Sequence, residues 1–251
     1  MKRVENSLSV RKMTIVGVLG GISIVLGMTP LGFIPIGPTR ATIMHIPVII
    51  GAITEGPLVG SLIGLIFGLF SIFQAITNPT PMSFVFLNPV VSVLPRVLIG
   101  IVTYYTYRFI KGLGENKALR VLNLLWIGII GYLAYGIYIN IVEFSSIWSL
   151  IINVVLIILS LIIGIYANKR LKNKAMDIII PSIVGTLTNT VGVLFSMYML
   201  YGRRLVSVLG QDINMVRNTI IGIGITNGIP ETIIAIIIVT NIIGALKSRN
   251  K

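Results

Sequence analysis

Cysteine is absent from the 251 residues, histidine occurs once, as His45, and only seven residues are acidic. Without cysteine the chain has no disulfide scaffold, no zinc–thiolate cluster and no thiol nucleophile. A single histidine rules out a multi-histidine metal site, and no GxSxG motif provides a nucleophile for His45 to activate. No segment matches the GxxxxGK[ST] phosphate-binding loop. We therefore expect no catalytic residue, no bound metal or cofactor, and no ATP hydrolysis by such a loop in this chain.

Charge is also scarce, and apolar residues are abundant. Charged residues make up 11% of the sequence and hydrophobic residues 55%, and the mean hydropathy is +0.98. A soluble domain has about 25% charged residues. The composition predicts an all-α integral membrane protein, in which one crossing takes about 20 apolar residues. The predicted spans are Met13 to Met28, Ala41 to Ile53, Pro57 to Ile76, Pro95 to Ile110, Val121 to Ile141, Ile147 to Ala167, Asp177 to Leu200 and Thr219 to Leu246.

Two apolar runs are short for a crossing. Ala41 to Ile53 needs flanking residues or burial among its neighbours. Phe84 to Leu94 is broken by Asn88-Pro89, which predicts a re-entrant or capping segment. Irregular backbone of this kind is stable at membrane depth only against protein or a water-filled cavity.

The basic residues predict the orientation in the cell membrane. With eight crossings and both termini cytoplasmic, most of the 20 Lys and Arg residues lie on the cytoplasmic side. This distribution accounts for the net charge of +13 without a nucleic-acid partner. The remaining basic residues are all arginine, which suits carboxylate and phosphate recognition or contact with lipid headgroups. They are Arg40, Arg96, Arg203, Arg204 and Arg217.

Glu231 and Arg96 are the charged residues most expected at a binding site. A carboxyl group inside the last predicted span needs a partner or a ligand. Arg96 follows Pro95, which favours the first turn of a helix, where amide dipoles also attract an anion. Arg96 therefore either binds an anionic substrate or pairs with Glu231, and both roles are compatible if the pair lines a pocket.

Uncharged polar residues are predicted in the same outer half of the membrane. Gln74, Asn189 and Asn227 either contact substrate or tie helices together by hydrogen bonds. Pro230 crowds the carbonyl group of Thr226, so the last span resembles the interrupted helices that carry transporter binding sites.

The segment from Thr29 to Arg40 contains three prolines and two glycines between apolar residues. It is apolar enough to cover a pocket and stiff enough to move as a unit, so we expect a lid. His45 follows it, either as a packing and hydrogen-bonding residue or as a titrating switch.

Glycines spaced by four allow another helix to approach closely. Gly17 and Gly21, with Gly20 beside them, form one such set in the first span. Gly60, Gly64 and Gly68 form another in the third. The approaching helix belongs either to this chain or to a partner.

Four motifs in order resemble the substrate-binding S components of energy-coupling factor (ECF) vitamin transporters, and most closely the pantothenate-type branch. They are the run from Gly37 to Ile53, Phe84 to Pro89 with Val93 to Arg96, Gly185 to Thr190, and Thr226 to Glu231. From these motifs and the polar residues above, the candidate substrate-binding residues are Arg96, Asn227, Asn189, Glu231, Asn88, Gln74, Arg40, Thr42 and His45.

The resemblance implies a membrane protein that binds a vitamin from outside and delivers it with partners. Those partners are a membrane coupling subunit and two cytoplasmic ATPases, which use the ATP. Gly17 and Gly21, with Gly20, match the position through which the family contacts the coupling subunit, and Thr29 to Arg40 matches its gating loop. A carboxylate-bearing polyol amide such as pantothenate suits Arg96 with Asn and Thr partners.

The predicted topology departs from the family at one place. Family members usually have six helices, whereas this sequence predicts eight in a single membrane domain spanning 1–251. The additional pair forms an inserted hairpin at 115–174, which leaves a six-helix core. A proton-coupled secondary transporter using Glu231, an S component for another vitamin, and a membrane enzyme remain as alternatives. An inverted repeat, which would favour the secondary transporter, is not evident.

Overall fold

The computed structural model describes residues 9–29, 32–36, 39–113, 176–208 and 216–249, together with scattered positions between 117 and 161. The chain divides into two compact units. The first comprises Met1–Tyr107 and Pro181–Lys251, and the second comprises Arg108–Ile180. The predicted spans Val121 to Ile141 and Ile147 to Ala167 belong to the second unit and lie outside the continuously described ranges, so the inserted hairpin stays a prediction.

Helices make up most of the described chain. The long ones are α1 (Val10–Met28), α3 (Pro57–Thr77), α6 (Leu94–Leu113), α9 (Met176–Val208) and α10 (Val216–Arg249), and α2 (Ile46–Glu55) is shorter. Two single-turn helices, α4 (Ser83–Phe86) and α5 (Pro89–Ser92), precede α6. A two-stranded sheet of β1 (Phe33–Ile36) and β2 (Thr39–Thr42) lies between α1 and α2.

Five helical segments of the described chain are long and apolar enough to cross a membrane. They are Val10–Met28, Pro57–Thr77, Pro89–Leu113, Asp177–Leu205 and Val216–Leu246. Each coincides with a predicted span. The multi-pass membrane character expected from composition is therefore confirmed.

The predicted span Ala41 to Ile53 is wrong in its extent. Its first residues pair in β2, and the helix that follows has only ten residues, Ile46–Glu55. Pro47 stands in the first turn of α2, where its missing amide donor costs nothing. The helix ends at Gly56, whose positive φ of 107° allows a sharp turn into α3.

The segment predicted to act as a lid contributes to an antiparallel pair of strands, the hairpin of β1 and β2, in an otherwise helical fold. Phe33 pairs with Thr42 and Ile36 with Thr39, and the amide of Ile43 donates to the carbonyl of Gly32 beyond the strands. Edge strands tolerate proline because one side of each strand needs no ladder bonds, so Pro35 fits within β1. α10 packs against β2 and α2.

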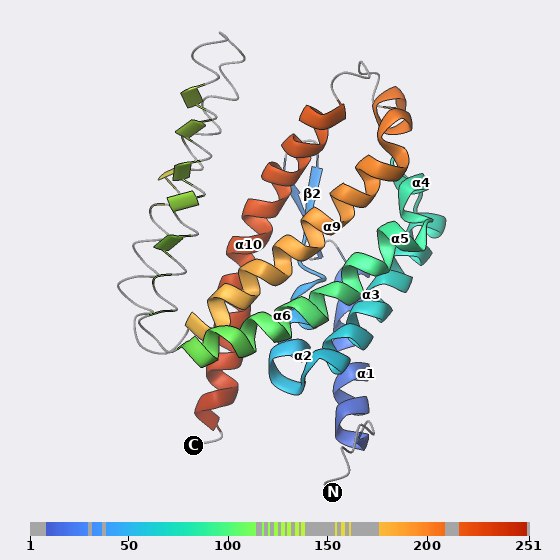
Figure 1. Ribbon diagram of the computed structural model, residues 1–251. Helices are drawn as coiled ribbons and strands as arrows, with labels where there is room; N and C mark the ends of the chain where they lie inside the picture. The colour runs from blue at the N-terminus through green and yellow to red at the C-terminus, as the bar shows by residue number, and fades with distance from the viewer. Residues whose placement is uncertain are drawn as a thin grey trace, which may run out of the picture. The chain divides into compact units, whose positions relative to one another are not determined.

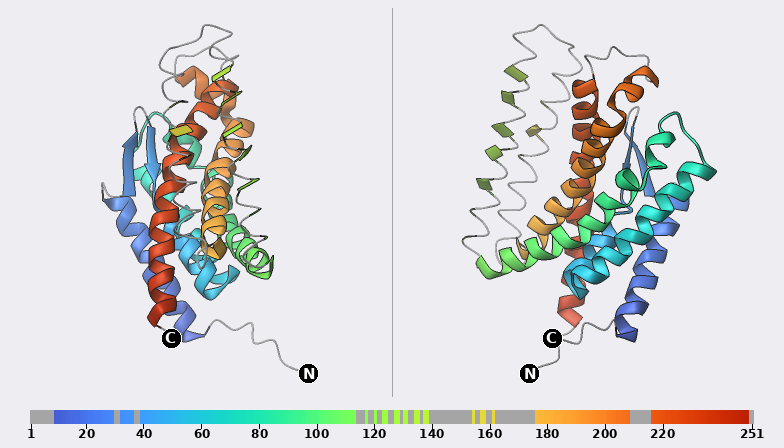
Figure 2. Two further views of the ribbon diagram at one scale, coloured as in Figure 1. Left: turned by 90° about the vertical axis from the view of Figure 1, so that its left-hand side faces the viewer. Right: turned by 45° about the vertical axis from the view of Figure 1, so that its right-hand side comes forward.

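The two ends of the first unit carry different elements (Figure 1). α1 begins and α10 ends at one end, whereas the hairpin, α4 and α5 lie toward the other. The turned views show the same arrangement (Figure 2). Near the second end, Val85 of α4 and Val91 of α5 share an apolar cluster with Met197 of α9 and Ile220 of α10. The run Phe84 to Leu94 is thus a capping segment of two short helices.

Neither the glycines of α3 nor the proline of α10 interrupts its helix. Gly60, Gly64 and Gly68 face the backbone of the α5–α6 segment, so the close approach expected there is within this chain. α10 continues through Pro230 to Arg249, and the interrupted helix expected from Thr226 and Pro230 is not present.

Candidate functional site

Glu231 joins three elements of the first unit by hydrogen bonds. Its side chain is 3% exposed. Oε1 accepts from the backbone amide of Thr42 at 2.7 Å. Oε2 accepts from Oγ1 of Thr190 at 3.0 Å. The carboxyl group of α10 therefore fastens β2 and α9, and Thr42 enters the site through its backbone.

His45, between β2 and α2, is fully buried. Its Nε2 lies 3.1 Å from Oγ1 of Thr186, whose hydroxyl donates to the carbonyl of Ser182 at 2.9 Å. Because that hydroxyl has one proton, it accepts from Nε2–H of His45 when it donates to Ser182. Nδ1 of His45 is buried without a hydrogen-bond partner among the described residues.

Arg96 lies in the first turn of α6 and is 6% exposed. Nη1 donates to the carbonyl of Val91 at 2.6 Å. The guanidinium carbon is 5.3 Å from the ring centre of Phe67 and 5.8 Å from that of Phe86. Cation–π contacts of this kind strengthen when water is excluded. Nε of Arg96 is buried with no partner in the described part of the chain.

The ion pair with Glu231, one of the two roles left open for Arg96, does not form in the described chain. Within the described residues the only salt bridge joins Arg11 to Glu55, at 3.0 Å. Arg96 is nevertheless close enough to attract the carboxyl group of Glu231 electrostatically. It also exerts an electrostatic effect on His45. Both charged groups are therefore buried in the first unit, and each is held by uncharged partners.

Asn189 adds an unpartnered acceptor on α9. It is 3% exposed, and its Oδ1 is buried without a partner in the described ranges. Thr186, Asn189 and Thr190 are three or four residues apart and so share one helix face. Through that face α9 reaches both His45 and Glu231.

Unpartnered buried polar atoms are concentrated at these residues. Of the five in the described chain, three belong to His45, Arg96 and Asn189. Leaving such an atom unsatisfied costs about 1–3 kcal/mol. In native proteins the missing partner is commonly an ordered water, an ion or a ligand. Arg96, His45, Asn189 and Glu231, with Thr42 and Thr190, form what we call the polar site.

The remaining predicted residues have other contacts. Oδ1 of Asn88 accepts from the amide of Val90 as the N-cap of α5, and Nδ2 donates to Tyr201. Asn227 lies half-buried on α10, one turn before Glu231. Arg40 lies on β2 opposite Pro35, and its side chain is outside the described part.

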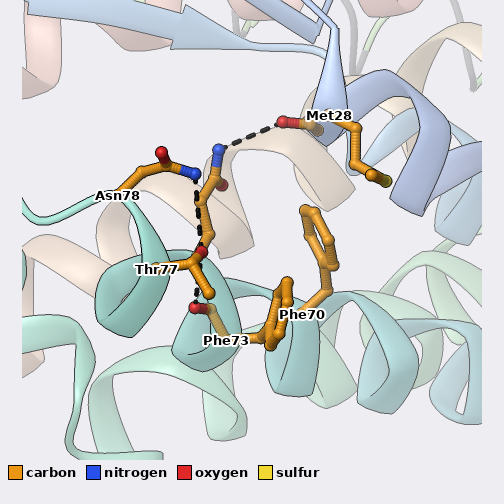
Figure 3. Close-up of a pocket in the computed structure, with 7 residues that line it drawn as sticks. Met28, Phe70, Phe73, Thr77 and Asn78 are labelled. Carbon is orange, nitrogen blue, oxygen red and sulfur yellow. Dashed lines mark hydrogen bonds between the residues drawn. The ribbon is translucent and has the colours of Figure 1, made fainter.

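Gln74 lines a separate pocket near the ends of α1 and α3 (Figure 3). Its Nε2 donates to the carbonyl of Gly27 at 3.1 Å. The cavity has a volume of about 180 Å³ and is lined by Gly27, Met28, Phe70, Phe73, Gln74, Thr77 and Asn78. No residue of the polar site lines it.

Sequence reasoning missed several contacts of the polar site. Thr186 and Thr190 were detectable, because they share a helix face with Asn189 in an apolar span. Phe67 and Phe86 gave no signal, since aromatic residues in apolar helices are ordinarily packing residues. The carbonyl of Val91, which accepts from Arg96, belongs to α5, and a single residue, Val93, separates α5 from α6.

α1 presents a largely open face. Cβ atoms added at Gly17 and Gly21 would meet nothing within 4 Å. Val18 and Val25 beside them are 56% and 60% exposed. Gly20 does not share this face, because it is buried against Ile66 of α3.

The outer arginines of α9 and α10 are exposed. Arg203, Arg204 and Arg217 all face away from the interior. The guanidinium carbon of Arg204 is 4.6 Å from the ring centre of Phe84.

The described chain is thus a helical membrane protein with a group of buried polar side chains in its first unit. The family model described as ECF transporter, substrate-specific component, matches residues 11–152, more than half of the chain. The chain belongs to this family of membrane transport proteins.

Two curated relatives are similar to the chain. The pantothenic acid transporter PanT of Lactococcus lactis subsp. cremoris is 27% identical over 228 residues, covering 85% of this chain and 81% of the relative. The pantothenate transporter PanT of Leuconostoc mesenteroides subsp. mesenteroides is 35% identical over 99 residues, covering 39% of this chain and 44% of the relative.

Proposed function

We propose that this chain is the subunit that binds pantothenate at the outer side of the cell membrane for ATP-driven import. Family membership supports the role in vitamin uptake. Both curated relatives are named as pantothenate transporters, which supports the choice of substrate.

The observation that carries the proposal is the environment of Arg96. It is a buried guanidinium group with an unpartnered Nε and no carboxylate within ion-pair distance in the described chain. A charge in such a place needs an anion. Pantothenate supplies a carboxylate for Arg96, and its hydroxyl and amide groups suit the unpartnered Oδ1 of Asn189 and the ring nitrogen Nδ1 of His45.

Glu231 has a different role from direct recognition of an anion. Its two oxygens hold Thr42 and Thr190, so it fixes the hairpin on the polar site. Ligand hydroxyls donate to its remaining lone pairs. Thr42, His45 and Asn189 complete the contacts, and Asn227 and Arg40 lie on the elements that border them.

Partner subunits complete the importer. The open face of α1 around Gly17 and Gly21 is the docking surface for the membrane coupling subunit, because small residues allow a partner helix to approach closely. Two cytoplasmic ATPases supply the energy. Both termini lie in the cytoplasm, in keeping with α1 beginning and α10 ending at one end of the first unit (Figure 1).

Direct binding tests the proposed role. The purified chain in detergent is titrated with pantothenate by calorimetry, with other water-soluble vitamins as competitors. We expect saturable binding of pantothenate that the other vitamins do not displace. Tight binding of another vitamin would replace the substrate and leave the transport role. Uptake by vesicles containing this chain alone, driven by a pH gradient, would instead favour a proton-coupled transporter.

A further inference from the structure

α3 meets the segment that carries Arg96 through a ladder of glycines. A Cβ added at Gly60 would lie 2.9 Å from the Cα atom of Gly100, and one at Gly68 would lie 2.8 Å from the carbonyl oxygen of Ser92. Gly64, between them, faces the backbone of Arg96 itself. Along α3 the contacts move back along the α5–α6 segment in steps of four residues, as in an antiparallel helix pair.

Gly64 sets the position of the first turn of α6. A Cβ added there would collide with the carbonyl carbon and oxygen of Arg96 and would lie 3.2 Å from the Cα atom of Val97. These are backbone atoms, which cannot rotate away as a side chain can. One turn earlier, Oγ of Ser61 donates to the carbonyl of Val97 at 3.3 Å and fixes the same approach.

Phe67 lies one turn after Gly64 on the same helix. It is 2% exposed, and its ring lies against the guanidinium group of Arg96. Phe86 and the carbonyl of Val91 make the other contacts of that group. The side chain of Arg96 is thus held at its backbone by Gly64 and at its charged end by Phe67. A group held at both ends loses little conformational entropy when it binds an anion.

We infer that Gly64 and Phe67 are positioning residues that hold Arg96 for the carboxylate of an acidic substrate, and so determine the preference for the acid over an uncharged analogue. The inference rests on the proposed function, because it takes Arg96 as the contact for the substrate carboxylate. Gly64 acts through the backbone of Arg96, and Phe67 acts through its guanidinium group. Substituting either residue is therefore expected to change the ratio of the affinity for the acid to the affinity for its uncharged analogue. The affinity for the uncharged analogue itself should change little.

The test compares pantothenate with panthenol, in which a primary alcohol replaces the carboxylate. Dissociation constants are measured by calorimetry for the full chain and for Gly64→Ala, Phe67→Leu, Gly60→Ala and Arg96→Ala. We expect the unsubstituted chain to bind the acid about tenfold or more tightly than panthenol, because a hydrogen bond to a charged group contributes that much to affinity. Arg96→Ala should abolish this preference. Gly64→Ala and Phe67→Leu should lose most of it while the affinity for panthenol changes by less than about threefold.

Gly60→Ala is the matched control, because it adds the same methyl group to the same ladder, against Ala52 and Gly100 and away from Arg96. It should keep the preference. Phe67→Leu carries the test if Gly64→Ala fails to fold, since it adds no volume at the helix contact. Equal weakening of both ligands by Phe67→Leu or Gly64→Ala would overturn the inference while leaving the proposed function intact. Equal affinity of the unsubstituted chain for the two ligands would remove Arg96 from carboxylate recognition and overturn the inference with it.

Discussion

The buried carboxyl group of Glu231 has a structural role, because it accepts two hydrogen bonds from other elements. Glu231 accepts from the amide of Thr42 and the hydroxyl of Thr190, so it links the hairpin to two membrane helices. The amide of Thr42 is partly buried, and leaving a buried amide unsatisfied costs up to about 1–3 kcal/mol. The hairpin is therefore more stable over the polar site while Glu231 is in place.

We expect Glu231→Ala to speed release of bound pantothenate by about tenfold, because the amide of Thr42 loses its acceptor. The measurement is a chase experiment with labelled ligand on the purified chain. Thr190→Val is the matched control, since it removes the other hydrogen bond and leaves that of Thr42. Equal release rates for the two variants would contradict a fastening role for Glu231.

Arg96 permits a second substitution test. Arg96→Ala should weaken pantothenate binding by about 1.5 to 3 kcal/mol, the range of a hydrogen bond to a charged group. Arg96→Lys should restore only part of this, because an ammonium group does not reproduce the planar guanidinium fork. Calorimetry on the three proteins measures the series. Unchanged affinity in Arg96→Ala would remove this residue from the site.

The sequence predicted which polar residues of the apolar segments are buried, but it did not predict which groups they contact. Arg96, Asn189, His45 and Glu231 stand out as polar residues in apolar segments, and all are buried in the first unit. Glu231 accepts from the hydroxyl of Thr190 and from the backbone amide of Thr42, and no side-chain pattern can indicate the second of these. Phe67 acts on Arg96 only through a helix approach that depends on Gly64.

At the scale of elements, length and hydropathy predicted the long helices, whereas the segment between α1 and α2 was only partly predicted. Its prolines and glycines indicated an apolar lid, but β1 and β2 depend on pairing with each other. That pairing shortened the second predicted span to α2, with Pro47 in its first turn. The prolines and glycines therefore located the segment between the helices. Its strand structure depends on hydrogen bonds between residues that are distant in the sequence.

Gly21 and Gly20 lie on different faces of α1, and substitutions at the two positions are expected to have different effects. Gly21→Leu places a bulky side chain on the open face and should weaken co-purification with the coupling subunit without changing pantothenate affinity. Gly20→Leu should lower the thermal stability of the chain itself, because a side chain there meets Ile66. Pull-down and thermal unfolding of both variants separate the effects. Loss of stability in Gly21→Leu with unimpaired assembly would contradict docking through this face.

At the scale of the whole molecule, the orientation follows from the distribution of basic residues. The absence of cysteine makes the orientation directly measurable, because each introduced thiol is the only one in the chain. Val10→Cys at the start of α1 and Asn78→Cys at the end of α3 are both exposed positions. In intact cells we expect a membrane-impermeant thiol reagent to label Asn78→Cys alone, and labelling of Val10→Cys alone would invert the topology.

Binding of pantothenate to the purified chain tests the central claim most directly. Because the polar site lies within one unit of this chain, binding should need neither the coupling subunit nor the ATPases. We expect calorimetry to give one saturable site with a dissociation constant below about 1 µM, a free energy of about −8 kcal/mol. No binding of pantothenate at that concentration, with tight binding of a different vitamin, would contradict the assignment.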